Sequence, residues 1–261
     1  MRRIAVFGLG SIGQRHVKNL LEMGETDVLG CDVRTGDEGF MPDLPITITS
    51  AASMVWDWKP DVVLVCVPPA GHHGLVLQAL AHNCSVFCEK PLAISHEKAI
   101  DLVRYNDGKN VLAVGYQLLA CPSVQAFTKD WKQLYIWDKQ DMGAWPKGTY
   151  LRDLLLDFSH EISLALFWAG SMPEVANIRW IDSAKSAITL SWPDGRVATI
   201  DLSGNYQGYE RGATSNSGEW LFNKEENDLA YRRELEAFLL GEPYCTGEDA
   251  LNVMRVLEML R

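Results

Sequence analysis

Three glycines near the N-terminus have the spacing of a phosphate-binding turn. Gly8, Gly10 and Gly13 follow a short apolar run at residues 4–7 and open an amphipathic segment at 12–23. In such a turn the first glycine permits a tight bend, the second lets the backbone approach a pyrophosphate, and the third allows close helix–strand packing. The helix N-terminus adds unpaired N–H groups and the positive end of its dipole. We therefore predict a dinucleotide-phosphate site at Gly8, Gly10, Ser11, Ile12 and Gly13, with a glycine-rich turn that binds no ligand as the alternative.

An acidic residue at the end of the next apolar run bears on the choice of dinucleotide. Asp32 lies about 19 residues beyond Gly13, where a carboxylate can accept hydrogen bonds from the hydroxyls of an adenosine ribose. This placement favours NAD, because the carboxylate would repel a 2′-phosphate. Arg34, two residues on, would partly offset that repulsion, so NADP stays an alternative. The simpler interpretation is that Asp32 only caps the strand end.

The elements around these residues predict a parallel sheet. Up to about residue 115, short apolar runs rich in β-branched residues alternate with amphipathic, helix-length segments. The runs are 4–7, 28–31, 62–67, 86–88 and 111–114, and the helical segments are 12–23, 71–82 and 95–105. Their nearly continuous apolar character suits strands that are buried on both faces. We predict an α/β fold, with an N-terminal Rossmann doubly wound parallel sheet.

The pattern changes in the second half of the chain. A helix-like stretch at 122–130 precedes a Trp-rich linker at 131–150 and a helix at 157–169. Strand-like runs at 174–181, 186–192 and 196–203 are joined by turn residues and predict antiparallel hairpins. Two amphipathic helices, about 228–240 and 247–260, follow. We predict a dinucleotide-binding domain at 1–117 and a reduced C-terminal α+β domain at 118–261, whose last helix packs back on the first domain.

Composition excludes several classes of protein. The net charge of -10 and the pI near 5.1 argue against a nucleic-acid-binding protein, which needs clustered Lys and Arg. No run of about 18 apolar residues occurs, so no membrane span is expected. The six cysteines are scattered, and Cys84 and Cys88 have no second pair of ligands at zinc spacing. We expect a cytoplasmic protein without a bound metal.

Four further motifs resemble the Gfo/Idh/MocA family of oxidoreductases, named after glucose-fructose oxidoreductase and inositol dehydrogenase. The most specific is Glu89-Lys90-Pro91 after the strand-like run at 86–88, because a GxGxxG turn alone fits many families. The others are the segment 67–72 with Val67, Pro68 and His72, the segment 114–117 with Gln117, and the segment 156–162 with Asp157 and His160. Together with the glycine turn, the resemblance extends over essentially the whole chain.

The resemblance implies a Rossmann domain followed by a mostly antiparallel sheet that often forms the oligomer interface. It further implies that Lys90 lies beside the nicotinamide and the substrate and that His160 is the acid/base. The substrates of the family are usually sugars, cyclitols or sugar derivatives, oxidised at a secondary alcohol. The chemistry agrees, because alcohol oxidation needs a base near neutral pKa and a cation that stabilises the developing oxyanion. A homodimer or homotetramer is expected on the same ground.

The other residues carried over from the family have weaker predicted roles. Asp157 precedes His160 by three residues, so both would share a face of one helix and the carboxylate would orient the imidazole; Asp157 as the cap of that helix is weighed equally. Glu161 is expected to contribute solubility or a contact to the Rossmann domain. The predicted cofactor-binding residues outside the glycine turn are Asp32, Val67, Pro68, His72, Glu89, Lys90 and Gln117.

Two departures from the family concern the substrate. The junction reads Gly115-Tyr116-Gln117, followed by two leucines where the family commonly has Arg and Phe, so an Arg for an anionic substrate is absent. The segment 131–156 is also short compared with that of other members. Trp145, Tyr150 and Arg152 are candidate substrate contacts there, together with Lys90 and His160, although the tryptophans are as well explained by packing.

Three functions stay open on the sequence alone. The first is an NAD(P)-dependent dehydrogenase or reductase acting on CH–OH groups of a sugar-like substrate. The second is a dinucleotide-binding sensor or partner protein that has lost catalysis. The third is a family variant that uses NAD only transiently, with no net redox change.

Overall fold

The computed structural model describes residues 2–36, 40, 42–106, 108–127, 130–144 and 153–261. The chain divides into two compact units. The first unit contains residues 1–115 and 231–248, and the second contains residues 116–230 and 249–261. Each unit is thus built from two separate stretches of sequence. The predicted domains, with their boundary after residue 117, stay a prediction.

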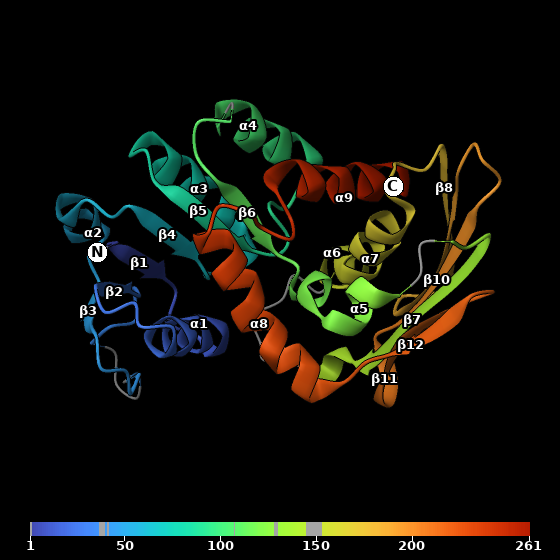
Figure 1. Ribbon diagram of the computed structural model, residues 1–261, viewed down its shortest axis with the longest axis horizontal. Coiled ribbons are helices and arrows are strands. Elements are labelled where there is room, and N and C mark those ends of the chain that lie inside the picture. The colour runs from blue at the N-terminus through green and yellow to red at the C-terminus, as the bar shows by residue number, and fades with distance from the viewer. Residues whose placement is uncertain (1, 37–39, 41, 107, 128–129, 145–152) are drawn as a thin grey trace. The chain divides into compact units, whose positions relative to one another are not determined.

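The first unit contains a six-stranded parallel sheet, drawn in blue to green in Figure 1. Its strand order is β3-β2-β1-β4-β5-β6, with the order reversing beside β1, as in doubly wound dinucleotide-binding folds. The strands are β1 (Ile4–Phe7), β2 (Val28–Cys31), β3 (Thr47–Thr49), β4 (Val62–Val65), β5 (Ser85–Glu89) and β6 (Leu112–Gly115). Every residue of β1, β2, β4 and β6 is buried, which explains why the sequence marks them so clearly.

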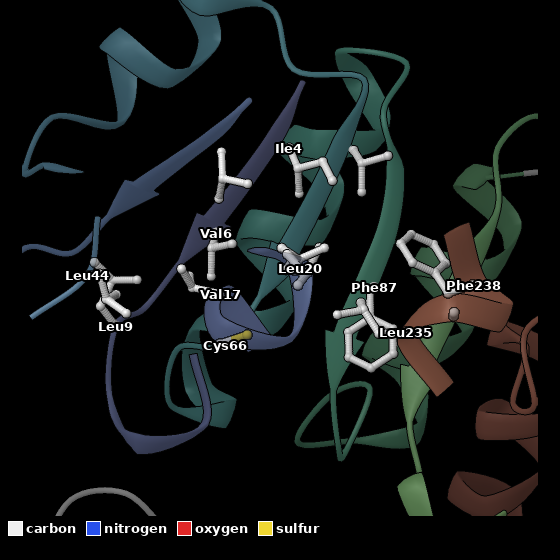
Figure 2. Close-up of a cluster of buried hydrophobic side chains, with 14 residues drawn as sticks. Ile4, Val6, Leu9, Val17, Leu20, Leu44, Cys66, Phe87, Leu235 and Phe238 are labelled. Atoms are coloured by element: carbon white, nitrogen blue, oxygen red, sulfur yellow. The ribbon is translucent and has the colours of Figure 1, made fainter. Parts of the chain in front are cut away.

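Helices cross between these strands. They are α1 (Ser11–Glu22), α2 (Ala52–Trp58), η1 (Pro69–Gly71), α3 (His72–Ala81) and α4 (His96–Asn106). The core between α1 and the sheet also includes Leu235 and Phe238 from near the C-terminus. Figure 2 shows Phe87 of β5 beside Phe238, and their ring centroids are 5.6 Å apart. The first unit therefore needs the 231–248 stretch to complete its core.

The second unit contains a mixed six-stranded sheet of order β12-β11-β7-β10-β9-β8. The strands are β7 (Gln133–Asp141), β8 (Val175–Asp182), β9 (Lys185–Ser191), β10 (Val197–Ser203), β11 (Asn205–Ser215) and β12 (Gly218–Leu221). All pairs are antiparallel except β7 with β10. The predicted hairpins are confirmed, and so is the fold class: a parallel Rossmann sheet with a second, mostly antiparallel sheet. The interpretation of 131–150 as a linker is wrong, because this stretch contains β7.

The remaining helices are η2 (Gln117–Ala120), α5 (Pro122–Ala126), η3 (Met142–Ala144), α6 (Leu154–Asp157), α7 (Ser159–Ala169), α8 (Lys224–Leu239) and α9 (Gly247–Met259). The helix predicted at 157–169 is confirmed as α7, but it begins two residues later, since Phe158, with φ −99° and ψ 27°, separates it from α6. The unit boundary falls within α8, between Ala230 and Tyr231. Within the described residues, no helix combines the length and the apolar character that crossing a membrane requires.

Candidate active site

The predicted phosphate turn lies between β1 and α1 of the first unit. Gly8 has φ +87°, and a Cβ there would lie 2.6 Å from the backbone oxygen of Cys66. A Cβ on Gly13 would lie 1.8 Å from the oxygen of Gly8. A Cβ on Gly10, in contrast, would meet nothing within 4 Å. The protein's own packing thus requires glycine at positions 8 and 13, whereas position 10 faces open space.

The start of α1 suits an anion. Gly10 is its N-cap residue, no side chain caps the first turn, and that turn carries no acidic residue. The first N–H groups of a helix have no partner within the helix and can bind a phosphate. The open position at Gly10 and these donors fit a dinucleotide pyrophosphate, as the sequence predicts.

Asp32, just after β2, is bound by neighbours in the first unit. Its Oδ2 accepts the N–H of Leu9 at 2.7 Å, and the guanidinium of Arg34 donates to both oxygens at 3.0 and 2.7 Å. Burial opposes ionisation of this carboxyl, but the bonds from Arg34 and Leu9 outweigh it and lower the pKa of Asp32. Arg34 also lies 4.0 Å over the ring of Phe40. A ribose bound at Asp32, as the sequence predicts, would share the carboxylate with Arg34.

His72 joins two of the segments that the sequence assigns to the cofactor. Its Nδ1 lies 2.7 Å from the oxygen of Pro91, and its Nε2 lies 2.9 Å from the oxygen of Val67. Burial lowers the pKa of His72, which favours a neutral ring that donates to one of the two oxygens. The imidazole thus holds the segment after β4, which includes Pro68, beside the segment after β5.

Lys90 follows directly on β5, at the carboxyl end of the parallel sheet, where ligands bind in open α/β folds. Its peptide bond to Pro91 is cis. Glu89, the last residue of β5, has its Oε1 2.8 Å from Nε2 of His16 on α1. Glu234 of α8 completes a group of three side chains whose polar atoms lie within 4.8 Å of one another. His16 and Glu234 belong to no motif of the sequence and are not among the predicted site residues.

His160 lies in the second unit, in the first turn of α7, and is 6% exposed. The ring of Tyr116 contacts it edge to face at 5.3 Å, and the Tyr116 hydroxyl donates to Oγ of Ser159 at 3.2 Å. The Oγ of Ser163 donates to the backbone oxygen of His160 at 2.7 Å. These contacts fix the position of the imidazole within its unit.

Asp157 ends α6, so it does not share one continuous helix with His160 as predicted. The alternative, that Asp157 caps the helix that bears His160, stays a prediction, and the N-cap residue of α7 is Phe158. The N-cap of α6 is Asp153, whose carboxylate accepts the N–H groups of Leu155 and Leu156 at 3.0 and 3.1 Å. Asp157 is buried beside the start of α7, at 5% exposure.

Glu161 is fully buried, which contradicts the expected contribution to solubility. Its Oε1 lies 2.6 Å from Nη2 of Arg211, and the same nitrogen lies 3.0 Å from Asp138. Burial opposes the charge of Arg211, but Asp138 and then Glu161 outweigh it and raise the pKa of the guanidinium. Because Asp138 is on β7 and Arg211 on β11, this cluster anchors α7, and with it His160, to the second sheet.

The structure describes one of the remaining predicted site residues and not the other three. Gln117 is buried in η2, and its amide donates to Oδ1 of Asn227 at 3.2 Å. Trp145, Tyr150 and Arg152 lie outside the described residues.

Comparisons with known proteins agree with this geometry. The model of the GFO_IDH_MocA family, described as an oxidoreductase family with an NAD-binding Rossmann fold, matches residues 2–116. An inositol 2-dehydrogenase from Paracoccus denitrificans is 29% identical over 136 residues, which are 49% of this chain and 40% of the relative. The chain thus spans well under two thirds of the length of this relative.

Solved structures share the fold over the whole chain. UDP-N-acetylglucosamine 3-dehydrogenase from Acidithiobacillus ferrooxidans superposes with a TM-score of 0.81 at 16% identity, over 100% of this chain and 96% of that chain. The WlbA dehydrogenase from Thermus thermophilus, in complex with NAD and UDP-GlcNAcA, has a TM-score of 0.81 at 19% identity, over 98% of this chain and 93% of that chain. Residues 2–116 thus match the model of the Gfo/Idh/MocA family, described as having an NAD-binding Rossmann fold, and the solved dehydrogenase structures share the fold of the chain.

Proposed function

We propose that this protein is an NAD(P)-dependent dehydrogenase or reductase. It transfers hydride between the nicotinamide and a secondary alcohol or ketone of a sugar, sugar derivative or cyclitol. The observation that carries the proposal is the glycine turn before α1, where Gly8 and Gly13 are fixed by packing and Gly10 leaves an open approach to helix N–H groups. The bound nicotinamide supplies the hydride acceptor or donor.

In this proposal the chain's own residues handle the proton and the charge. His160 takes the hydroxyl proton as the alcohol is oxidised, since an imidazole titrates close to the operating pH. Lys90 holds the same oxygen and stabilises its developing negative charge. Asp157, as the third predicted catalytic residue, supports the imidazole electrostatically from the end of α6.

The substrate class rests on the relatives. One relative is an inositol 2-dehydrogenase. One structural neighbour is a UDP-N-acetylglucosamine 3-dehydrogenase, and another is a dehydrogenase in complex with NAD and UDP-GlcNAcA. A polyhydroxylated ring with a secondary alcohol is common to these molecules. We propose a substrate of this class, with Trp145, Tyr150 and Arg152 as candidate contacts in addition to Lys90 and His160.

The test combines binding and turnover. Calorimetric titration with NAD(H) and NADP(H) measures cofactor affinity, and a panel of cyclitols, sugars, sugar acids and UDP-sugars is followed at the NADH absorbance band. We expect NAD(H) binding, and turnover that falls by at least about 100-fold in Lys90→Ala and in His160→Ala. Lys109→Ala, at an exposed lysine after α4, is the matched control and should leave turnover unchanged.

The outcomes separate the three functions. Cofactor binding without turnover on the whole panel contradicts the dehydrogenase and favours a dinucleotide sensor. Cofactor that survives dialysis, with substrate consumed but no net change in NADH, favours the transient-redox variant. Failure to bind any dinucleotide contradicts all three.

Two wider expectations belong to the same proposal. A cytoplasmic location is supported by the six buried cysteines, none of which forms a disulfide. A homodimer or homotetramer is supported by apolar side chains exposed on β8, among them Trp180 and Ile181. Light scattering during size-exclusion chromatography tests the oligomer, and a mass of one chain would contradict it.

A further inference from the structure

Three polar side chains from distant parts of the sequence, two of them buried and Glu89 half-buried, meet at the end of β5. His16 comes from α1, Glu89 from β5 and Glu234 from α8, and all belong to the first unit. His16 is 0% and Glu234 4% exposed. Their polar atoms lie within 4.8 Å of one another, with Nε2 of His16 2.8 Å from Oε1 of Glu89. Burying two carboxyl groups this close together requires a proton or a cation to balance their charge.

Glu234 is the more deeply buried of the two carboxyl groups and the one that lacks a hydrogen-bond partner at Oε1 among the described residues. Burial, followed by the charge of Glu89, raises the pKa of Glu234 well above its ordinary range. A carboxylic acid there can donate to the carboxylate of Glu89, whereas two carboxylates would repel each other.

Other titratable groups around the cluster do not compete for this proton. Burial, followed by the charge of Glu89, raises the pKa of the thiols of Cys66 and Cys88 well above their ordinary range, so both stay neutral. His72 responds to the charges of Glu89 and Lys90, but its ring nitrogens face backbone oxygens. Lys90 itself is the next residue after Glu89.

The cluster has a direct geometric link to Lys90. Glu89 pairs with Gly115 of β6, and a Cβ on Gly115 would lie 3.2 Å from the Glu89 carboxylate, so this carboxylate lies against the neighbouring strand. On the other side of Lys90, the oxygen of Pro91 is held by His72. Lys90 is therefore the residue between two anchored neighbours.

We propose that Glu234 is a positioning residue for Lys90, acting as a neutral acid that donates to Glu89 while His16 donates to the same carboxylate. The two donors fix Glu89, and the fixed Glu89 sets the backbone from which the Lys90 side chain extends. This inference rests on the proposed function, in which Lys90 holds the reacting oxygen. It adds a residue of α8, far from Lys90 in the sequence, to the residues that position Lys90.

A divalent cation is the competing occupant, since one imidazole and two carboxylates also suit zinc. The hydrogen-bond distance between His16 and Glu89 favours the proton. So does Nδ1 of His16, which has no partner among the described residues, whereas a metal-binding histidine nearly always donates its second N–H. The two occupants make opposite predictions for Glu234→Gln, because an amide mimics a protonated carboxyl but is a poor replacement for a carboxylate ligand.

The test uses three variants of the full chain. Glu234→Gln keeps a neutral donor, Glu234→Met keeps the volume without a donor, and Glu236→Gln changes an exposed carboxyl two residues along the same helix. Infrared spectroscopy at neutral pH should show the C=O band of a protonated carboxylic acid in the wild type and in Glu236→Gln, but not in Glu234→Gln. NMR of ¹³C-labelled lysines, assigned with Lys90→Arg, follows the titration of Lys90.

We expect Glu234→Gln to retain the Lys90 titration and kcat within about twofold, and Glu234→Met to shift the titration and lower kcat about tenfold with KM for the cofactor little changed. An absent C=O band, a stoichiometric divalent metal lost in Glu234→Gln, or an unchanged Lys90 titration in Glu234→Met would each overturn the proposal. The infrared and NMR results stand without any turnover, so a failure of the proposed dehydrogenase function is seen separately, as a wild type inactive on every substrate.

Discussion

The two units balance buried carboxyl groups in different ways. In the second unit, Asp138 and Glu161 share the guanidinium of Arg211. In the first unit, Glu89 and Glu234 lie beside His16, and burial together with the charge of Glu89 raises the pKa of Glu234, so that in our proposal a proton balances the pair. A guanidinium keeps its charge at any physiological pH, whereas a proton shared by carboxyl groups is lost as the pH rises. The anchor of His160 is therefore permanent, and the anchor that we propose for Lys90 titrates.

The largest expected effect comes from removing the permanent charge. Arg211→Ala leaves two buried carboxylates without their cation and should lower the free energy of unfolding by about 3–5 kcal/mol. Urea denaturation followed by tryptophan fluorescence measures it. Lys139→Ala is the matched control, because Lys139 pairs with Glu210 across the same two strands at an exposed position and should change the midpoint little. Similar losses in both variants would contradict the importance of burial.

The same Glu to Gln substitution should separate the two clusters. Glu161→Gln replaces a carboxylate bonded to a buried guanidinium and should lower the free energy of unfolding by about 1.5–3 kcal/mol at pH 7. Glu234→Gln replaces a neutral acid with a neutral amide and should not lower the free energy of unfolding at pH 7. If urea midpoints at pH 7 fall equally in both, the two clusters are not balanced differently.

A third comparison is between a half-exposed arginine, Arg34 beside Asp32, and the buried Arg211. The side chain of Arg34 is 48% exposed, against 8% for Arg211, so Arg34→Ala should lower the free energy of unfolding by less than about 1 kcal/mol at neutral pH. Since the folded pKa of Asp32 is lowered, the stabilisation exists above the unfolded pKa and is lost as the pH falls through the folded pKa. The difference from the wild type should therefore vanish in acid.

Calorimetric titration of Arg34→Ala with NAD and NADP tests whether Arg34 affects the choice of cofactor. Loss of Arg34 leaves Asp32 as the charge nearest the ribose hydroxyls, so the ratio of NAD to NADP affinity should rise. An unchanged ratio would show that Arg34 has no part in cofactor choice.

The smallest expected effect is that of Glu234→Gln on the free energy of unfolding at low pH. This difference from the wild type should grow as the pH rises. Below the unfolded pKa, Glu234 is protonated in both states. As the pH rises towards the raised folded pKa, only the unfolded chain ionises, so the wild type loses stability that the variant keeps. Thermal unfolding from pH 4 to 9 should show a variant increasingly more stable than the wild type. A constant difference would mean that Glu234 is ionised when folded.

The sequence predicts the strands that are buried on both faces, but it does not reveal the strands that are partly exposed. The strands of the first sheet were found because they are short, apolar runs, except β3, whose three residues include only one that is buried. β7 alternates buried and half-exposed positions, but Tyr135 and Trp137 occupy the half-exposed ones and hide the alternation. Only two residues of β11 are buried, and they are adjacent, so the strand carries no alternating apolar pattern.

The candidate site was predictable in its glycines and motifs, but not in the partners that hold them. Glu234 occupies a position of the buried face of α8, four residues after Ala230 and four before Phe238, and a carboxylate at such a position was the available signal. His16 lies likewise on the buried face of α1. Nothing in local sequence relates positions 16, 89 and 234, because only the tertiary fold brings them together. The break at Phe158 was hidden for the opposite reason, since the apolar pattern continues through it.

The division of the chain has a consequence for its synthesis. Val114 of β6 donates to the oxygen of Cys245, Ala113 is bridged to Thr246, and Leu235 and Phe238 fill the core beside α1. A ribosome releases the first 115 residues long before these partners exist, at about 5–20 residues per second. During the several seconds before residues 231–248 are synthesised, the Rossmann sheet has an exposed apolar face and an incomplete edge. Its final folding is therefore one of the last events after translation, although its sequence comes first, and chaperone binding to the nascent chain should be strongest over this interval.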